Sequence, residues 1–299
     1  MKRKIYYSIA FLLMLLALYK VYNIAKNQIE DKKHREWVAT LEHTASKNVH
    51  ILPDTILVDY LDEKRTLAIY LPDNFEEDSI EYPVIYFLDG QSLFDQKIQK
   101  GTEWQIDEHL DSLSRIGKQK AIVVGVYNSE RRMKEYKPFR STKIYSDKIV
   151  SGDKHAEWIA YDLKKWIDQR YRTLSEQKFT TIAGASLGGL MSYYMLNEYY
   201  NIYGSAIVFS PSFWVNPIVY SLHEENPKIH QQKIYFNAGE LETPTVESIK
   251  KMKTILIDYG VNQDYIKLDV EKELGHWHMT WQKGFVNAIP WIWIENQNE

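Results

Sequence analysis

Short, almost continuously apolar runs recur along the chain and predict the strands of a buried sheet. They cover residues 82–88, 121–127, 180–183, 204–210 and 233–237. Continuous apolar runs of this length are typical of strands that helices cover on both faces of a parallel sheet. An earlier pair of runs, at 55–61 and 66–71, flanks a short polar turn and predicts an N-terminal hairpin.

Segments with a helical spacing of apolar residues lie between these runs. The predicted helices cover residues 102–114, 154–171, 191–199, 246–259 and 282–294. Residues 264–271 alternate between apolar and polar, like a half-exposed strand. Because buried strands alternate with helices, the pattern predicts an α/β fold with a mostly parallel central sheet and helices on both faces.

The N-terminal segment predicts export or membrane attachment. Basic residues at 2–4 precede an apolar run at 5–19, and semi-apolar residues continue beyond Lys20 to Ala25. This order is typical of signal anchors and signal peptides, and positive charge tends to stay on the cytoplasmic side. We therefore expect residues 1–25 to be an uncleaved signal anchor or a cleaved signal peptide. The remainder would be extracytoplasmic (periplasmic or at the cell surface), or secreted after cleavage.

Composition narrows the possible functions. The polar segment 26–50 predicts a stalk or linker, and residues 51–299 are long enough for one α/β domain. The net charge is −3 and no long basic block occurs, so we expect no nucleic-acid partner. The absence of cysteine excludes disulfides, thiol catalysis and thiolate metal sites. His276-x-His278 could hold a metal, but no other ligand cluster supports it, and we expect neither a metal nor a cofactor.

Residues 184–188 provide a candidate nucleophile. Gly184-Ala185-Ser186-Leu187-Gly188 fits the G-x-S-x-G pattern of a nucleophile elbow, between a predicted strand and a predicted helix. The glycines let strand and helix pass closely, and the free N–H groups at the helix N-terminus favour developing negative charge. This context predicts an exposed, activated Ser186.

A serine nucleophile needs a base and an orienting acid, which in this architecture follow it in the order acid, then histidine. Gly275 frees the backbone next to His276, so we favour His276 as the base, with His278 as the alternative. The acid belongs on a strand-end loop. Glu242 and Glu240 both lie just past Gly239, and we favour Glu242.

Other polar and aromatic residues follow predicted strands and could contact a substrate. The backbone N–H of Leu187 and one from the Gly90-Gln91 region are candidate oxyanion-hole donors. The candidate substrate contacts are Arg132, Tyr136, Trp214 and Trp277. Arg131 could replace Arg132 in binding an anionic or polar group.

From about residue 52 to 296, the chain also resembles the esterase family of the α/β-hydrolase superfamily. That family contains enterochelin-type siderophore esterases, feruloyl esterases and S-formylglutathione hydrolase. The motifs that carry the resemblance lie at 82–91, 123–126, 132–138, 183–189, 210–214, 275–276 and Trp281. The resemblance implies an α/β-hydrolase fold, with Ser186 as nucleophile and His276 as base. It implies an acid three residues after a strand-end glycine, which is Glu242 here.

We therefore expect a serine hydrolase that cleaves carboxylic esters through an acyl-enzyme, without a cofactor. The Arg-x-x-Glu-Tyr-x-Pro pattern at 132–138 favours the siderophore-esterase-like branch, and feruloyl or sugar esters are further candidate substrates. The alternatives are an acyltransferase that uses the same triad and a non-catalytic binding protein of the cell envelope. The sequence leaves the oligomeric state open.

Overall fold

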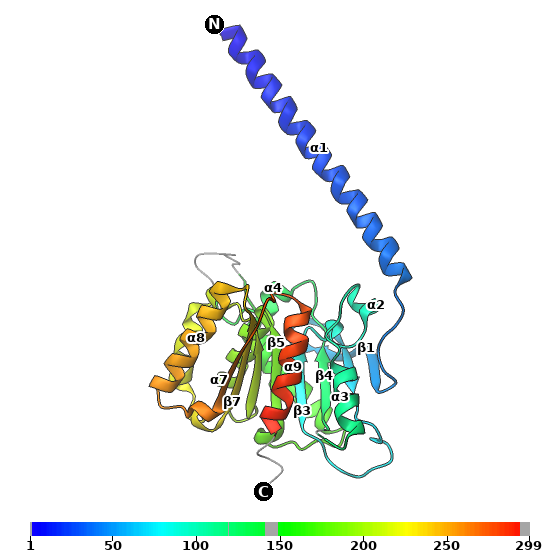
Figure 1. Ribbon diagram of the computed structural model, residues 1–299, viewed down its shortest axis with the longest axis vertical. Helices are drawn as coiled ribbons and strands as arrows, with labels where there is room; N and C mark the ends of the chain where they lie inside the picture. The colour runs from blue at the N-terminus through cyan, green and yellow to red at the C-terminus, as the bar shows by residue number, and fades with distance from the viewer. Residues whose placement is uncertain (1, 119, 141–148, 294–299) are drawn as a thin grey trace.

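The computed structural model describes residues 2–118, 120–140 and 149–293, except for the side chains of residues 2–6 and 8–12. A single long helix, α1 (Lys2–Thr40), extends away from the rest of the molecule (Figure 1). The predicted stalk at 26–50 therefore divides into the second half of this helix, a short connection and the start of the first strand.

Residues 2–25 of the predicted membrane anchor lie within α1, and residue 1 lies outside the described residues. Among the residues that the structure describes, none of the helices is both long enough and apolar enough to cross a membrane. The side chains of residues 1–6 and 8–12 fall outside that description, and they form a large part of the apolar run. The structure thus gives the expected anchor no support.

The domain is built on an eight-stranded sheet with the order β1-β2-β4-β3-β5-β6-β7-β8 (Figure 1). The strands are β1 (Val49–Val58), β2 (Glu63–Tyr70), β3 (Val84–Leu88), β4 (Ile122–Val126), β5 (Thr180–Ala185), β6 (Ser205–Phe209), β7 (Lys233–Gly239) and β8 (Ile266–Glu271). The expected N-terminal hairpin is present, since β1 and β2 pair antiparallel, with a bulge between Leu52 and Ile56. β2 also pairs antiparallel with β4, and the strands from β4 to β8 are parallel, which confirms the mostly parallel sheet.

Helices connect the strands and cover both faces of the sheet. They are α2 (Gln96–Gln99), α3 (Ile106–Arg115), α4 (Arg132–Glu135), α5 (Gly152–Trp158), α6 (Lys164–Asp168), α7 (Leu187–Glu198), α8 (Thr243–Asp258) and α9 (His278–Trp293). Short 3-10 helices cover Asp59–Leu61, Gly90–Ser92, Gln177–Phe179, Phe213–Val215, Pro217–Glu225, Ile229–Gln231 and Gln263–Tyr265. The single helix expected at 154–171 is instead α5 and α6 joined by a π-helical stretch, Ile159–Leu163.

Two hydrophobic cores form because successive strand residues point to opposite faces. Tyr86 and Leu88 of β3 belong to the core under α5, α6, α7 and α8. Ile85 and Phe87 belong to the core under α3 and α9. Polar residues at the carboxyl ends of the parallel strands consequently gather along one edge of the sheet.

Candidate active site

Ser186 occupies a strained turn between β5 and α7. Its φ and ψ angles are 58° and −118°, a conformation that non-glycine residues rarely adopt. A Cβ on Gly184 would lie 2.7 Å from the backbone of Gly188, so no larger residue fits between strand and helix there. The backbone N–H of Ser186 donates to Phe209 O at 3.0 Å and ties the turn to β6. This is the geometry of a nucleophile elbow.

Glu242 follows the end of β7 and is held by three donors. Its Oε1 accepts from Gly239 N–H at 2.9 Å and from Ser210 Oγ at 2.8 Å. Its Oε2 lies 2.5 Å from His276 Nδ1. Burial alone would raise the pKa of Glu242, but the bonds from His276, Gly239 and Ser210 outweigh burial and hold the pKa below its ordinary value. The carboxylate is therefore ionised at neutral pH.

An ionised carboxylate can only accept hydrogen bonds, so the proton between the two residues belongs to His276 Nδ1. His276 Nε2 is then the acceptor nitrogen. Trp281 stands edge-on to the imidazole, with ring centroids 5.3 Å apart, and its Nε1 donates to Ser210 Oγ at 2.9 Å. One indole thus packs against the histidine and supports the serine that holds Glu242.

The structure separates the favoured residues from their alternatives. Glu240 is exposed, and its Oε2 accepts from the backbone N–H of Glu273 at 3.0 Å. His278 begins α9, and its Nε2 lies 3.2 Å from Gln99 Nε2. Burial lowers the pKa of His278. His276 and His278 therefore have different partners, Glu242 and Gln99.

A cavity of about 250 Å³ opens beside Ser186. It is lined by Asp89, Gln91, Ser92, Gln99, Trp104, Asn128, Arg132, Ala185, Ser186, His278 and Trp281. Its walls combine two indole rings with amide, hydroxyl, imidazole and guanidinium groups.

The loop after β3 forms one side of the cavity and is fixed by Asp89. Arg132 grips both carboxylate oxygens of Asp89, with Nε and Nη2 each at 2.7 Å, and Asn128 Nδ2 adds a bond of 2.5 Å. Asp89 has a left-handed backbone, with φ of 63°. A Cβ on the next residue, Gly90, would lie 2.3 Å from the backbone of Gly125. These constraints set the position of Gln91, the candidate oxyanion residue.

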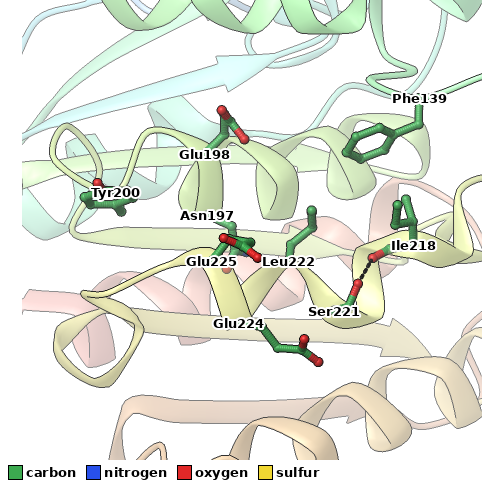
Figure 2. A pocket seen from close by; sticks show the side chains of 9 residues that line it. All are labelled: Phe139, Asn197, Glu198, Tyr200, Ile218, Ser221, Leu222, Glu224 and Glu225. Carbon is green, nitrogen blue, oxygen red and sulfur yellow. Dashed lines mark hydrogen bonds between the residues drawn. The ribbon is translucent and has the colours of Figure 1, made fainter.

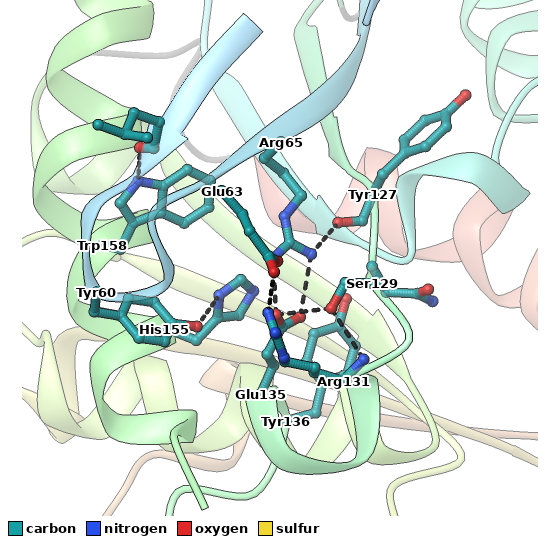
Figure 3. A network of polar contacts seen from close by, with 12 residues as sticks. Tyr60, Glu63, Arg65, Tyr127, Ser129, Arg131, Glu135, Tyr136, His155 and Trp158 are labelled. Carbon is teal, nitrogen blue, oxygen red and sulfur yellow. Dashed lines mark hydrogen bonds and ion pairs between the residues drawn. The ribbon is translucent and has the colours of Figure 1, made fainter. Parts of the chain in front are cut away.

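Tyr136 corrects one expectation from the sequence. It is completely buried, its hydroxyl accepts from the backbone N–H of Asp89 at 3.0 Å, and it does not line the cavity beside Ser186, so it supports the loop from behind. Figure 3 shows Tyr136 beside a buried network in which Arg65 Nη1 and Nη2 bind Glu135 at 3.1 and 2.8 Å. His155 stacks on Tyr136 in the same network.

The remaining predicted contacts lie in different surroundings. Leu187 is buried at the first position of α7, where helix N–H groups have no partner within the helix. Trp214 and Trp277 are about half exposed and do not line the cavity beside Ser186. Arg132 does line it.

A larger cavity of about 500 Å³ lies elsewhere, between the end of α7 and the 3-10 helix Pro217–Glu225 (Figure 2). Glu198, Glu224 and Glu225 are among its lining residues. It contains none of the predicted site residues, and size alone therefore does not identify the active site.

Sequence reasoning missed several residues of the site. Ser210, Gln99 and Trp104 were not predicted as site residues, and Ser212 Oγ lies 3.2 Å from Ser186 Oγ. Asp89 directly follows β3, and Asn128 lies two residues after the end of β4. Polar residues at strand carboxyl ends are the signal that could have identified both.

A mostly parallel sheet with helices on both faces and a strained serine between strand and helix defines the α/β-hydrolase class. A model of the family described as "Putative esterase" matches residues 59–291. The chain belongs to this family, and it is a carboxylic-ester hydrolase.

The chain is also similar to individual proteins outside the family model. The uncharacterized protein YbbA of Bacillus subtilis (strain 168) is 26% identical over 246 residues, which cover 78% of this chain and 94% of YbbA. A ferulic acid esterase structure has a TM-score of 0.66 at 16% identity, covering 82% of this chain and 98% of that one. The structure of enterochelin esterase from Shigella flexneri has a TM-score of 0.65 at 17% identity. The match covers 85% of this chain and 60% of that one. At these identities, the two structures show the shared fold.

Proposed function

We propose that the chain hydrolyses esters with Ser186 as nucleophile, His276 as base and Glu242 as the orienting acid. The observation that carries the proposal is the 2.5 Å contact between Glu242 and His276, in which Glu242 is itself held by Gly239 and Ser210. Such a carboxylate fixes the tautomer of the histidine and stabilises the imidazolium that forms when the histidine takes a proton.

The chemistry proceeds through an acyl-enzyme. Ser186 Oγ attacks the ester carbonyl while its proton moves to His276 Nε2. The bond from the carbonyl carbon to the alkoxy oxygen breaks, and the alcohol leaves with that proton. Water then attacks the acyl carbon while its proton moves to His276 Nε2. The bond to Ser186 Oγ breaks, the proton passes to Ser186 Oγ, and the carboxylic acid leaves. No cofactor takes part in these steps.

The oxyanion hole is assigned to the backbone N–H of Leu187 and an N–H of the Gly90-Gln91 loop. Leu187 supports this role as the first residue of α7, and the Asp89 contacts hold the loop on the other side. One such donor contributes about 3 kcal/mol to stabilisation of the transition state.

The proposed substrates are esters of aromatic or other polar-substituted acids, such as feruloyl, siderophore or sugar esters. The names of the similar structures, a ferulic acid esterase and an enterochelin esterase, support this class. The indoles of Trp104 and Trp281, next to the polar groups of Gln99 and Arg132, provide a matching surface in the cavity.

Labelling with a fluorophosphonate, followed by peptide mapping, tests the nucleophile. We expect labelling at Ser186, and we expect Ser186→Ala to lower p-nitrophenyl acetate hydrolysis by about 10³-fold or more while the protein stays folded. Ser221→Ala, at an exposed serine, is the matched control and keeps full activity. Activity that survives in folded Ser186→Ala would refute the proposal.

A pair of histidine variants tests the base. His276→Gln should lose about 10³-fold in kcat, because it removes the group that takes the proton. His278→Gln should mainly change KM, since His278 lines the cavity. The reverse result would transfer the role to His278.

We also propose that the esterase domain is exported and that α1 attaches it to the membrane. The basic residues at 2–4 followed by the apolar run at 5–19 support this location. Protease treatment of intact spheroplasts should degrade the domain if it lies outside the cytoplasm. Protection until the cells are lysed would contradict export.

A further inference from the structure

Three carboxylates form a compact group at the start of α3. Glu103, Asp107 and Glu108 each offer an oxygen, and these oxygens all lie within 4.8 Å of one another. Glu103 is 4% exposed and Asp107 is completely buried. The group is therefore not an acidic patch on the surface.

The three carboxylates have few hydrogen-bond donors and no counter-charge among the described residues. Asp107 Oδ2 accepts from the backbone N–H of Ser46 at 2.7 Å, and Glu103 accepts from the N–H of Gln105. Asp107 Oδ1 and Glu108 Oε2 are buried without a hydrogen-bond partner among the described residues. Within that same part of the chain, none of the three carboxylates forms an ion pair with Lys, Arg or His.

Buried carboxylates without a counter-charge are costly, and native proteins compensate them with a cation or a proton. The unpartnered Oδ1 belongs to Asp107, the most deeply buried residue of the group, and this oxygen can accept a further ligand. Helix α3 begins at Ile106, and its N-terminus favours negative charge, but it does not supply a partner for this oxygen.

We propose that Glu103, Asp107 and Glu108 bind a divalent cation, Ca²⁺. Carboxylate oxygens are the ligands that Ca²⁺ takes, at about 2.3–2.6 Å, so one ion can reach oxygens that all lie within 4.8 Å of one another. The donor set contains no nitrogen or sulfur, which disfavours zinc and copper. The proposal adds a metal site that the sequence analysis did not expect.

The site adjoins the wall of the catalytic cavity. Trp104 lies next to Glu103 in the chain and lines the cavity beside Ser186. The carbonyl of Glu103 accepts from Gln282 Nε2 of α9 at 2.6 Å. The bound ion would consequently hold α3, α9 and the segment around Ser46 together, as a structural and not a catalytic metal.

Calorimetry and thermal unfolding of the EDTA-treated full chain test the site. We expect CaCl2 to bind with one-to-one stoichiometry and to raise Tm, whereas NaCl of equal ionic strength does not. MgCl2, tested in parallel, should bind at least tenfold more weakly, since Mg²⁺ demands shorter, octahedral coordination.

Variants locate the binding to this group. Asp107→Asn should weaken Ca²⁺ binding at least tenfold, and Glu108→Gln serves if that variant does not fold. Glu130→Gln, at an exposed glutamate, should bind Ca²⁺ like the parent protein. The proposal fails if millimolar Ca²⁺ gives neither binding heat nor a Tm shift, or if folded Asp107→Asn and Glu108→Gln bind as the parent does. Neither outcome depends on ester hydrolysis.

Discussion

Two buried glutamates, Glu135 and Glu242, each bind a basic side chain, but the partners differ in exposure. Arg65, beside Glu135, is 4% exposed, whereas His276, beside Glu242, is 45% exposed. Burial alone would raise the pKa of both carboxyls, yet hydrogen bonds from their partners hold both pKa values below the ordinary value. Because both partners of the Arg65–Glu135 pair are buried, neither can contact a substrate, and the pair has a structural role. A pair that is open at the histidine can exchange protons with a substrate.

The largest expected effect removes the charge of Glu242. Glu242→Gln keeps the size of the side chain but no longer stabilises the imidazolium of His276, so kcat for p-nitrophenyl acetate should fall about 10³- to 10⁴-fold. Tm should change little. Glu240→Gln, two residues away, is the matched control and should retain parent kcat. A kcat for Glu242→Gln above a tenth of the parent value would show that catalysis does not depend on the charge of Glu242.

Arg65→Met should produce the largest loss of stability. Among the described residues it leaves the buried carboxylate of Glu135 with Ser129 as its side-chain hydrogen-bond partner, which costs about 3–5 kcal/mol in the free energy of unfolding. Urea denaturation measures the change. The double variant Arg65→Met/Glu135→Met removes both charges and should recover most of the loss. A double variant as unstable as Arg65→Met would contradict this account.

The histidine beside the Arg65–Glu135 pair, His155, predicts a pH dependence of stability. His155 is buried beside Glu135, and burial lowers its pKa from 6.5 to about 4, against the opposing charge of Glu135. Between pH 6.5 and about pH 4, His155 binds a proton in the unfolded chain but not in the folded protein. Acidification from about pH 6.5 to about pH 4 therefore destabilises the fold, by at most about 1.4 kcal/mol per pH unit from this residue.

His155→Phe should flatten that part of the stability curve, because phenylalanine does not titrate. Urea denaturation at intervals between pH 4 and pH 7 measures the slope. His50→Gln, at an exposed histidine, should leave the slope unchanged. An unaltered slope in folded His155→Phe would show that other groups cause the acid destabilisation.

Asp89→Asn should have the smallest effect of the four. Asp89 is a third carboxylate with a basic partner, and the variant weakens its bidentate bonds to Arg132. The Gly90-Gln91 loop would then be held less firmly, and we expect kcat to fall about tenfold with little change in Tm. Asp258→Asn, at an exposed aspartate, is the matched control and should retain the parent kcat. A kcat within twofold of the parent would exclude the positioning role of Asp89.

The sequence predicted the parts of the molecule that depend on local pattern. Continuous apolar runs identified the parallel strands, and the small residues around Ser186 identified the tight strand-to-helix turn. Gly275 favoured His276 over His278, the family resemblance favoured Glu242 over Glu240, and the structure brings Glu242 and His276 into contact. These features are encoded within a few residues or in the order of the elements.

Features that depend on distant residues could not be predicted in this way. Asp89 and Arg132 are 43 positions apart, and Gln99 and His278 are 179 apart, so only the folded sheet brings each pair together. The burial of Tyr136 has the same cause, because a tyrosine in a polar segment can face either the core or a cavity. The pattern around residue 105 also misled, since α3 begins only at Ile106, after a left-handed Gln105.

The sheet has two open edges, and neither offers a smooth template for another strand. β1 contains Pro53, which lacks an N–H donor, and its bulge between Leu52 and Ile56 interrupts the ladder. At the other edge, β8 carries Lys267, Asp269 and Glu271. Charges, proline and bulges at sheet edges obstruct edge-to-edge aggregation. Concentrated folded protein is thereby protected from growth into β-linked fibrils, a liability that eight strands in an open sheet would otherwise create.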